Sequence, residues 1–202
     1  MAGCSVHPTR IDFNFNPPPP LREEGEPSFA LIEDTSQLDS ELRRLVDFLD
    51  ASAVTNSVSR VGLFLHFLTL GPDLASANGI LSGIIPDRYR ISLAEEEDFI
   101  LQINRPRTST SVAGLKMNCI TKWSVDRFQV INILIAAATP VDPRVVSSPQ
   151  GREFVASSLV SDVNNAPTNA SLSGHQQSLL LAESLEIAKQ MQRESGLKVE
   201  GF

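Results

Sequence analysis

The sequence predicts a single α+β domain in which helices pack on one face of an antiparallel sheet of about four strands. Three observations lead to this class. An apolar fraction of 42% in 202 residues is enough for a hydrophobic core. Apolar residues recur at helical spacing over residues 36–53 and 175–194. Between these segments the pattern changes to alternation, which is typical of strands with one buried face.

The first 35 residues are predicted to form a flexible, acidic, proline-rich arm outside the core. The segment "NPPPPLREE" holds four consecutive prolines, which favour the polyproline II helix and exclude a central strand or a helix interior. Residues 1–57 carry ten acidic and four basic side chains, a charge of −6 against −7 for the whole chain. Pro17, Pro20 and Arg22 fit the PxxPxR pattern that SH3 domains bind. Because this pattern is short and common, a docking peptide and an arm without such a partner both remain open.

Five helices are predicted from the spacing of apolar residues. The first covers residues 36–53, with Ser36 as its N-cap and leucines along one face. The second, Val58 to Leu70, contains the run "VGLFLHFLTLG" and is predicted to be a buried helix that ends at Gly71. This run is shorter than the roughly 18–20 residues that span a bilayer. The other predicted helices cover residues 73–85, 150–163 and 175–194.

Four strands are predicted to follow one another as an antiparallel meander. They cover residues 88–93, 98–104, 115–125 and 127–138. Apolar and polar side chains alternate in the third strand, "LKMNCITKWSV", whereas the fourth is apolar on both faces and is placed centrally. Asp126 and Arg127 leave too little chain for a crossover, so the third and fourth strands are predicted to pair as a hairpin.

The predicted organisation is an arm over residues 1–35, a core domain over 36–163, a linker over 164–174 and an amphipathic C-terminal helix within 175–202. The linker is assigned from the composition of "NNAPTNASLSG". The apolar face of the last helix must be buried, either against its own domain or against another chain. Packing onto its own domain and self-association through this helix or an exchanged arm both remain open.

No group of side chains in the sequence predicts catalysis. His7, His66 and His175 share no ligand-like spacing with each other or with a cysteine or carboxylate, and His66 is interpreted as a partly buried structural residue. The motifs GxxxxGKS/T, GxGxxG, GxSxG and HExxH do not occur. The acidic run 95–98 indicates a solvated turn, because consecutive carboxylates point in different directions. We therefore expect a non-enzymatic protein with no catalytic residue, cofactor, metal site or small-molecule substrate.

The cysteines and the N-terminal sequence predict an intracellular protein. The two cysteines, Cys4 and Cys119, fall in the arm and in a strand, which does not indicate a disulfide framework. The first 20 residues lack the continuous apolar segment of a signal peptide. We expect a protein that is not secreted and has no transmembrane segment.

A basic face is the strongest binding signal in the sequence. If the strands pair as predicted, one surface gathers six cations: Arg88, Arg90, Arg105, Arg107, Lys116 and Lys122. Such a surface could bind phosphate groups, lipid headgroups or the acidic arm of the same chain. The alternative is an ordinary solvated face of a sheet that is buried on one side only.

The layout resembles that of small viral matrix proteins of the rhabdovirus type. The resemblance rests on "NPPPPLREE", the apolar run "VGLFLHFLTLG" and the strands after it, from Pro17 to Pro140. It implies self-assembly into a homo-oligomer in the host cytoplasm or virion, with contacts to nucleocapsid, membrane and other viral or host proteins. The chain departs from this pattern in its acidic N-terminus and in lacking a PPxY motif, which puts membrane attachment and budding through that motif in doubt. The alternative function is a host-interaction or regulatory adaptor of the viral accessory type, docking through the arm or the last helix.

Overall fold

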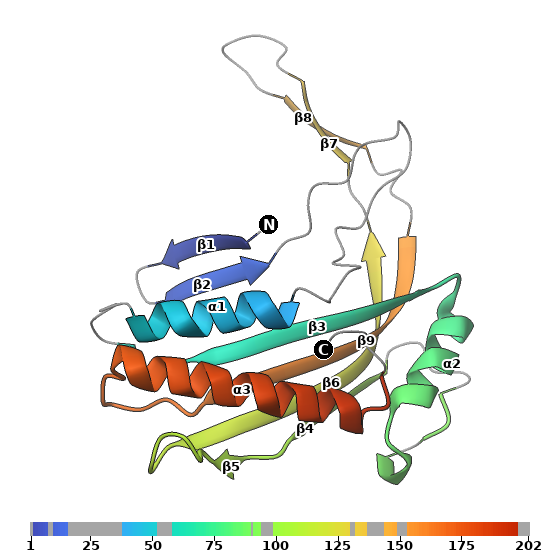
Figure 1. The fold of residues 1–202 in the computed structure, drawn as a ribbon. Helices are drawn as coiled ribbons and strands as arrows, with labels where there is room; N and C mark the ends of the chain where they lie inside the picture. The colour runs from blue at the N-terminus through green and yellow to red at the C-terminus, as the bar shows by residue number, and fades with distance from the viewer. Residues whose placement is uncertain are drawn as a thin grey trace.

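The computed structural model describes residues 2–7, 10–15, 38–51, 58–89, 91–93, 99–129, 132–136, 144–148 and 153–197. In this part of the chain, five strands form a central antiparallel sheet and three helices lie on one of its faces (Figure 1). This arrangement confirms the predicted α+β class.

The strands of the central sheet differ widely in length. They are β3 (Gly62–Gly71), β4 (Ile100–Asn104), β5 (Arg107–Thr108), β6 (Lys116–Gln129) and β9 (Glu153–Asn165). Two separate hairpins consist of β1 (Ala2–His7) with β2 (Arg10–Phe15) and of β7 (Asn132–Ala136) with β8 (Arg144–Ser148). The helices are α1 (Leu38–Ala51), α2 (Leu74–Ile84) and α3 (Gly174–Glu194), and a short 3-10 helix, η1, covers Asp87–Tyr89.

The order of strands in the sheet is β3–β9–β6–β4, with β5 also paired to β6. The late strand β9 therefore lies between β3 and β6 and pairs antiparallel with both. A meander requires neighbours in sequence to be neighbours in space, so the predicted meander is wrong although the sheet is antiparallel. As an inner strand, β9 is buried on both faces, and its small side chains such as Ala156 and Ser158 are fully covered.

Two segments predicted as helices are strands. Residues 58–70 contain all of β3 but its last residue, and residues 150–163 contain most of β9. A short run that is apolar on both sides fits a buried helix and a strand equally well, so its spacing alone cannot decide. The pairing of β3 with β9 along ten residue pairs, from Gly62–Asn164 to Gly71–Val155, decides for the strand.

Two predicted features of the other strands are also wrong. Asp126 and Arg127 do not form a hairpin turn, because β6 continues through them and pairs with Ala156 and Val155 of β9. The predicted strand 88–93 begins in η1 instead, where the Tyr89 N–H donates to the Pro86 carbonyl at 2.8 Å. A proline directly before this segment favours such a turn.

The helices predicted over residues 36–53, 73–85 and 175–194 are confirmed by α1, α2 and α3. Asp73 caps α2 by accepting from the Ser76 N–H at 2.7 Å. Ser173 and Gln176 form a reciprocal capping box at the start of α3. These short-range signals act within one turn of helix, which is why the sequence reveals them reliably.

The core lies between the sheet and the helices. The buried face of α3, including Leu180, Leu181 and Leu185, packs with α1 and with sheet residues such as Met117. A second cluster places α2 against Trp123 and its neighbours. The C-terminal helix is therefore packed on its own domain.

The segment predicted as a linker is also attached to this domain. Residues 164 and 165 belong to β9, Leu172 is buried, and its N–H donates to the Val58 carbonyl at 2.8 Å. Helix α1 runs antiparallel to α3 and is joined to it by ion pairs, among them Arg43–Glu186 at 3.2 Å. In the predicted arm, β1 and β2 form a hairpin, whereas Pro17, Pro20 and Arg22 lie outside the described residues.

Candidate functional site

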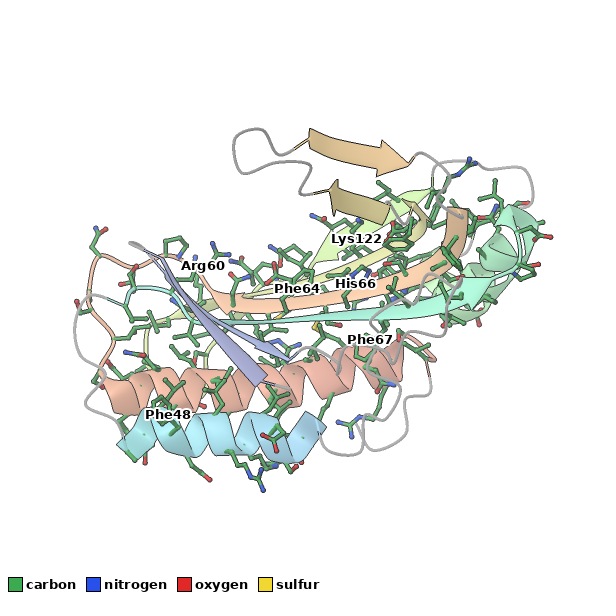
Figure 2. The ribbon with its side chains drawn as sticks, turned by 90° about the horizontal axis from the view of Figure 1, so that it is seen from above. Phe48, Arg60, Phe64, His66, Phe67 and Lys122 are labelled. Atoms are coloured by element: carbon green, nitrogen blue, oxygen red, sulfur yellow. The ribbon has the colours of Figure 1, made fainter. Side chains whose placement is uncertain are left out.

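The face of the central sheet that points away from the helices is the first candidate surface, and we call it the open face. Because side chains alternate along a strand, it consists of the even-numbered residues of β3, β4, β6 and β9. Phe64, His66 and Lys122 project from this face, whereas Phe67 projects toward the helices (Figure 2). Phe64 of β3 is 63% exposed and Ile100 of β4 is 65% exposed, both large values for apolar side chains.

Strand β3 forms one outer edge of the sheet, and we call this the β3 edge. The Asn165 N–H donates to the Val61 carbonyl at 3.1 Å, which fixes the odd-numbered residues as those that bond to β9. The N–H and carbonyl groups of the even-numbered residues 62, 64, 66, 68 and 70 therefore point outward. No other strand in the described part of the chain pairs with them, since β1 and β2 belong to a separate sheet.

The β3 edge lacks the features that usually prevent one sheet from pairing with another. Proteins protect edge strands with lysines, prolines, bulges or short length. β3 is ten residues long, reads "GLFLHFLTLG" and contains no proline or permanently charged side chain. The nearest such residues lie beyond its ends, at Arg60 and at Pro72 and Asp73.

His66 occupies the middle of the β3 edge. Its Nε2 atom lies 2.6 Å from the Ser158 hydroxyl and 3.6 Å from a carboxylate oxygen of Asp126. Burial lowers the pKa of His66, and the positive charge of Lys122 acts in the same direction, while the charge of Asp126 opposes both. His66 is therefore held toward its neutral form, and the prediction of a partly buried histidine agrees with its side-chain exposure of 33%.

The grouping of His66, Ser158 and Asp126 is not a catalytic triad. In a triad, the serine and the carboxylate contact opposite ring nitrogens, so that the acid orients the base. Here both partners approach Nε2. Ser158 is also fully buried, which leaves its hydroxyl no access to a substrate. The geometry supports a hydrogen-bonded structural histidine.

The predicted basic face is divided between two places. Lys116 and Lys122 lie on β6, on the open face. Arg88, Arg105 and Arg107 line one pocket at the other outer edge, and Arg90 is outside the described residues. The split has two causes. Arg105 and Arg107 are odd-numbered and Lys116 and Lys122 are even-numbered, so alternation puts them on opposite faces. Arg88 lies in η1 instead of the predicted strand 88–93.

This second candidate site is the arginine pocket, a solvent-open hollow of about 640 Å³. Its lining consists of Pro86, Asp87, Arg88, Tyr89, Arg105, Arg107 and Glu194. Arg105 donates to the Tyr89 hydroxyl at 3.0 Å and pairs with Glu194 at 3.2 Å. The guanidinium of Arg88 lies 4.9 Å from the centre of the Tyr89 ring. The hydrogen bond from Arg105 lowers the pKa of Tyr89, which reflects the positive field in this pocket.

Glu183 of α3 ties the β5–β6 turn to the helix layer. It accepts from the Ser109 hydroxyl at 2.6 Å and from the Thr110 N–H and hydroxyl at 2.8 and 2.9 Å. Burial acts to raise the pKa of Glu183, but these hydrogen bonds outweigh it and hold the pKa below its ordinary value. No pattern of neighbouring residues predicts the role of Glu183, and the apolar run at the β3 edge was consistent with a helix as well as a strand. The edge had a signal, since no permanently charged residue occurs from Val61 to Pro72.

Within the described ranges, no helix has the length and apolar character to cross a membrane, and no three histidine, cysteine or acidic side chains group as metal ligands. Comparisons of the chain with protein-family models, curated proteins and solved structures found no match.

Proposed function

We propose that the protein is a non-enzymatic assembly protein, similar in role to a viral matrix protein, and that two copies join through their β3 edges. The observation that supports this proposal is the β3 edge, which is long, carries no permanent charge and pairs with no other strand among the described residues. The partner is a second copy of the same chain, and the site of action is the host cytoplasm or the virion. Other virion components or a membrane surface would contact the assembled protein.

A second copy fits this edge because the strand is complementary to itself. The outward-pointing groups belong to residues 62, 64, 66, 68 and 70, so the antiparallel register that uses all of them centres on His66. In that register Phe64 lies opposite Leu68 of the other copy, and Gly62 lies opposite Leu70. Both pairs are on the open face, where cross-strand apolar contacts stabilise the pairing. A twofold axis at His66 closes the interface, which makes the dimer the building block.

Burial of apolar side chains adds to the main-chain hydrogen bonds. Phe64 is 63% exposed and Leu70 is 41% exposed in the single chain. Covering most of an exposed phenylalanine stabilises an interface by about 1–2 kcal/mol. The same pairing would continue the sheet, and with it the open face, across both copies.

The test is a charge placed on the edge. We expect Phe64→Lys to convert the dimer to a monomer, because the lysines would lie on the paired edge and could not be buried there. Size-exclusion chromatography with light scattering over a range of protein concentrations measures the result. Ile100→Lys is the matched control, since Ile100 is equally exposed on the open face but lies on β4. This control should still dimerise.

Two outcomes would contradict the proposal. One is a wild-type chain that stays monomeric at high concentration. The other is equal loss of dimer in both variants, which would place the contact on the open face as a whole.

The alternative function, a host-interaction adaptor, would have to dock through the N-terminal arm, because α3 packs on its own domain. Binding to a partner that is lost in a Pro17→Ala and Pro20→Ala variant would favour that alternative.

A further inference from the structure

We propose that the arginine pocket binds a phosphate group through Arg88, Arg105 and Arg107. Edge pairing does not use this pocket, so the inference goes beyond the proposed function. It assigns a ligand chemistry to the part of the predicted basic face that the fold brings together.

The three arginines reach the pocket from separate parts of the chain. Arg88 comes from η1, Arg105 follows β4, and Arg107 begins β5. The main chain at Arg105 is fixed, because its N–H donates to the Cys119 carbonyl of β6 at 3.0 Å. The main chain at Arg105 is thus ordered before a ligand binds, which limits the main-chain entropy that binding would cost.

The charges in the pocket are only partly compensated. Glu194 pairs with Arg105, the one guanidinium here that has a carboxylate partner among the described residues. Arg88 contacts the ring of Tyr89, and no described carboxylate lies within ion-pair distance of Arg88 or Arg107. Asp87 is a second carboxylate in the lining, and Arg107 also interacts with the Cys119 thiol. Three arginines still outnumber two carboxylates, and a guanidinium has five N–H donors, so Arg88 and Arg107 retain donors for an anion.

A phosphate group matches this arrangement better than a carboxylate does. A guanidinium binds two oxygens in a planar fork, and a phosphate can offer oxygens to several such forks at once. Glu194 already supplies one carboxylate to Arg105. Its side chain is 44% exposed and sits on the last residue of α3, so it can move aside for a ligand of higher charge.

Isothermal titration calorimetry with inorganic pyrophosphate tests the site on the full chain. We expect the double variant Arg88→Gln and Arg107→Gln to weaken binding about tenfold or more, since each charged hydrogen bond contributes about 1.5–3 kcal/mol. The matched control is Arg44→Gln with Arg60→Gln, which makes the same charge change at exposed arginines outside the pocket. The control should retain wild-type affinity.

Glu194→Gln supplies a test in the opposite direction. Removing the carboxylate that competes for Arg105 should strengthen pyrophosphate binding about two- to fivefold. Glu186→Gln is its control, because Glu186 lies on the same helix and pairs with Arg43 at the same distance of 3.2 Å. A gain that appears in both variants would indicate net charge only and would overturn the proposal.

Co-sedimentation with phosphatidylcholine vesicles, with and without phosphatidic acid, distinguishes the source of the phosphate. Binding to pyrophosphate alone indicates a soluble ligand, and binding to both indicates that a lipid headgroup also fits. Either result supports the site, provided that the Arg88 and Arg107 double variant loses it. Absence of pyrophosphate binding, or equal losses in the double variant and its control, overturns the proposal.

Discussion

The two outer edges of the central sheet are built in opposite ways. The edge formed by β4 and β5 is short, interrupted at Pro106 and flanked by arginines, and Glu183 and Glu194 of α3 tie it to the helix layer. The β3 edge is ten residues long, apolar and free of proline and permanent charge. Among the described residues, the edge formed by β4 and β5 thus has features that oppose further strand pairing, and the β3 edge lacks them. The proposed pairing therefore joins two copies through β3 only.

The largest effect on this difference should come from giving the β3 edge a proline. The Leu68 N–H points outward, so Leu68→Pro removes a donor from the proposed interface while every bond to β9 remains. Each copy loses one main-chain donor and leaves a carbonyl of the other copy without its partner, which costs about 1–3 kcal/mol for each lost bond. We therefore expect the dimer to be about a hundredfold weaker. Analytical ultracentrifugation measures the dissociation constant.

Proline at Leu65 is the comparison variant for this experiment. Leu65 is an odd-numbered residue of β3, so its N–H points toward its pair Ser161 on β9. Leu65→Pro therefore removes a main-chain hydrogen bond inside the sheet. We expect thermal unfolding to detect a large loss of stability in Leu65→Pro and little in Leu68→Pro. Equal destabilisation of the two proline variants would mean that the main-chain groups of the even-numbered β3 residues do not point outward.

The second-largest effect concerns the edge formed by β4 and β5. Glu183→Gln should weaken the attachment of the β5–β6 turn, because a neutral amide cannot accept from the Ser109 hydroxyl and the Thr110 N–H and hydroxyl as strongly. We expect a loss of about 1–3 kcal/mol in the free energy of unfolding, measured by urea denaturation. The control is Glu186→Gln, whose exposed ion pair with Arg43 contributes less than about 1 kcal/mol.

The pH dependence of that loss has a defined sign. The pKa of Glu183 is lower in the folded chain than its ordinary value of 4.5. The stabilisation is therefore complete above that value and disappears as the pH falls through the lower, folded pKa. The difference between wild type and Glu183→Gln should shrink in acid. A difference that stays constant there would contradict the role of the carboxylate.

Local signals explain what could be predicted. The caps at Asp73 and Ser173 and the alternation around Trp123 depend on residues close in sequence, and the helices and the strand they indicate are present. Strands β3 and β9 depend on each other instead, across about ninety residues, as the pair His66–Val160 illustrates. Neither segment has a pattern that excludes a helix, so only their pairing makes them strands.

The candidate sites could also be predicted only where their residues lie close together in the sequence. Arg105 lies in the connection after β4, where the sequence predicts a loop, whereas Arg107 begins strand β5. The companions that complete their pocket, Tyr89 and Glu194, come from η1 and from the end of α3. Their distance in sequence hid the site, and the same holds for the contact of Glu183 with the β5–β6 turn.

The smallest predicted effect is a dependence of β3 pairing on pH. In the proposed dimer, His66 of one copy lies opposite His66 of the other, with Lys122 and Asp126 of β6 as the nearest charged groups. Burial lowers the pKa of His66, so the neutral form is favoured in the folded chain and stability is lost as the pH falls through the ordinary value of 6.5. Two protonated histidines would also repel each other across the axis, which Asp126 only partly offsets. We expect the dimer to weaken several-fold between about pH 7.5 and about pH 5.5, on either side of that value.

His66→Gln isolates this effect from other titrations, because glutamine keeps a hydrogen-bonding side chain and cannot be protonated. Its dimer should have nearly the same dissociation constant at both pH values, measured by ultracentrifugation. His175→Gln is the control, since His175 lies on α3 beside Asp50 and far from the β3 edge in the helix layer. It should keep the pH response of the wild type. If His66→Gln keeps that response as well, the twofold axis does not pass through His66, and the register of the β3 pair must be shifted along the edge.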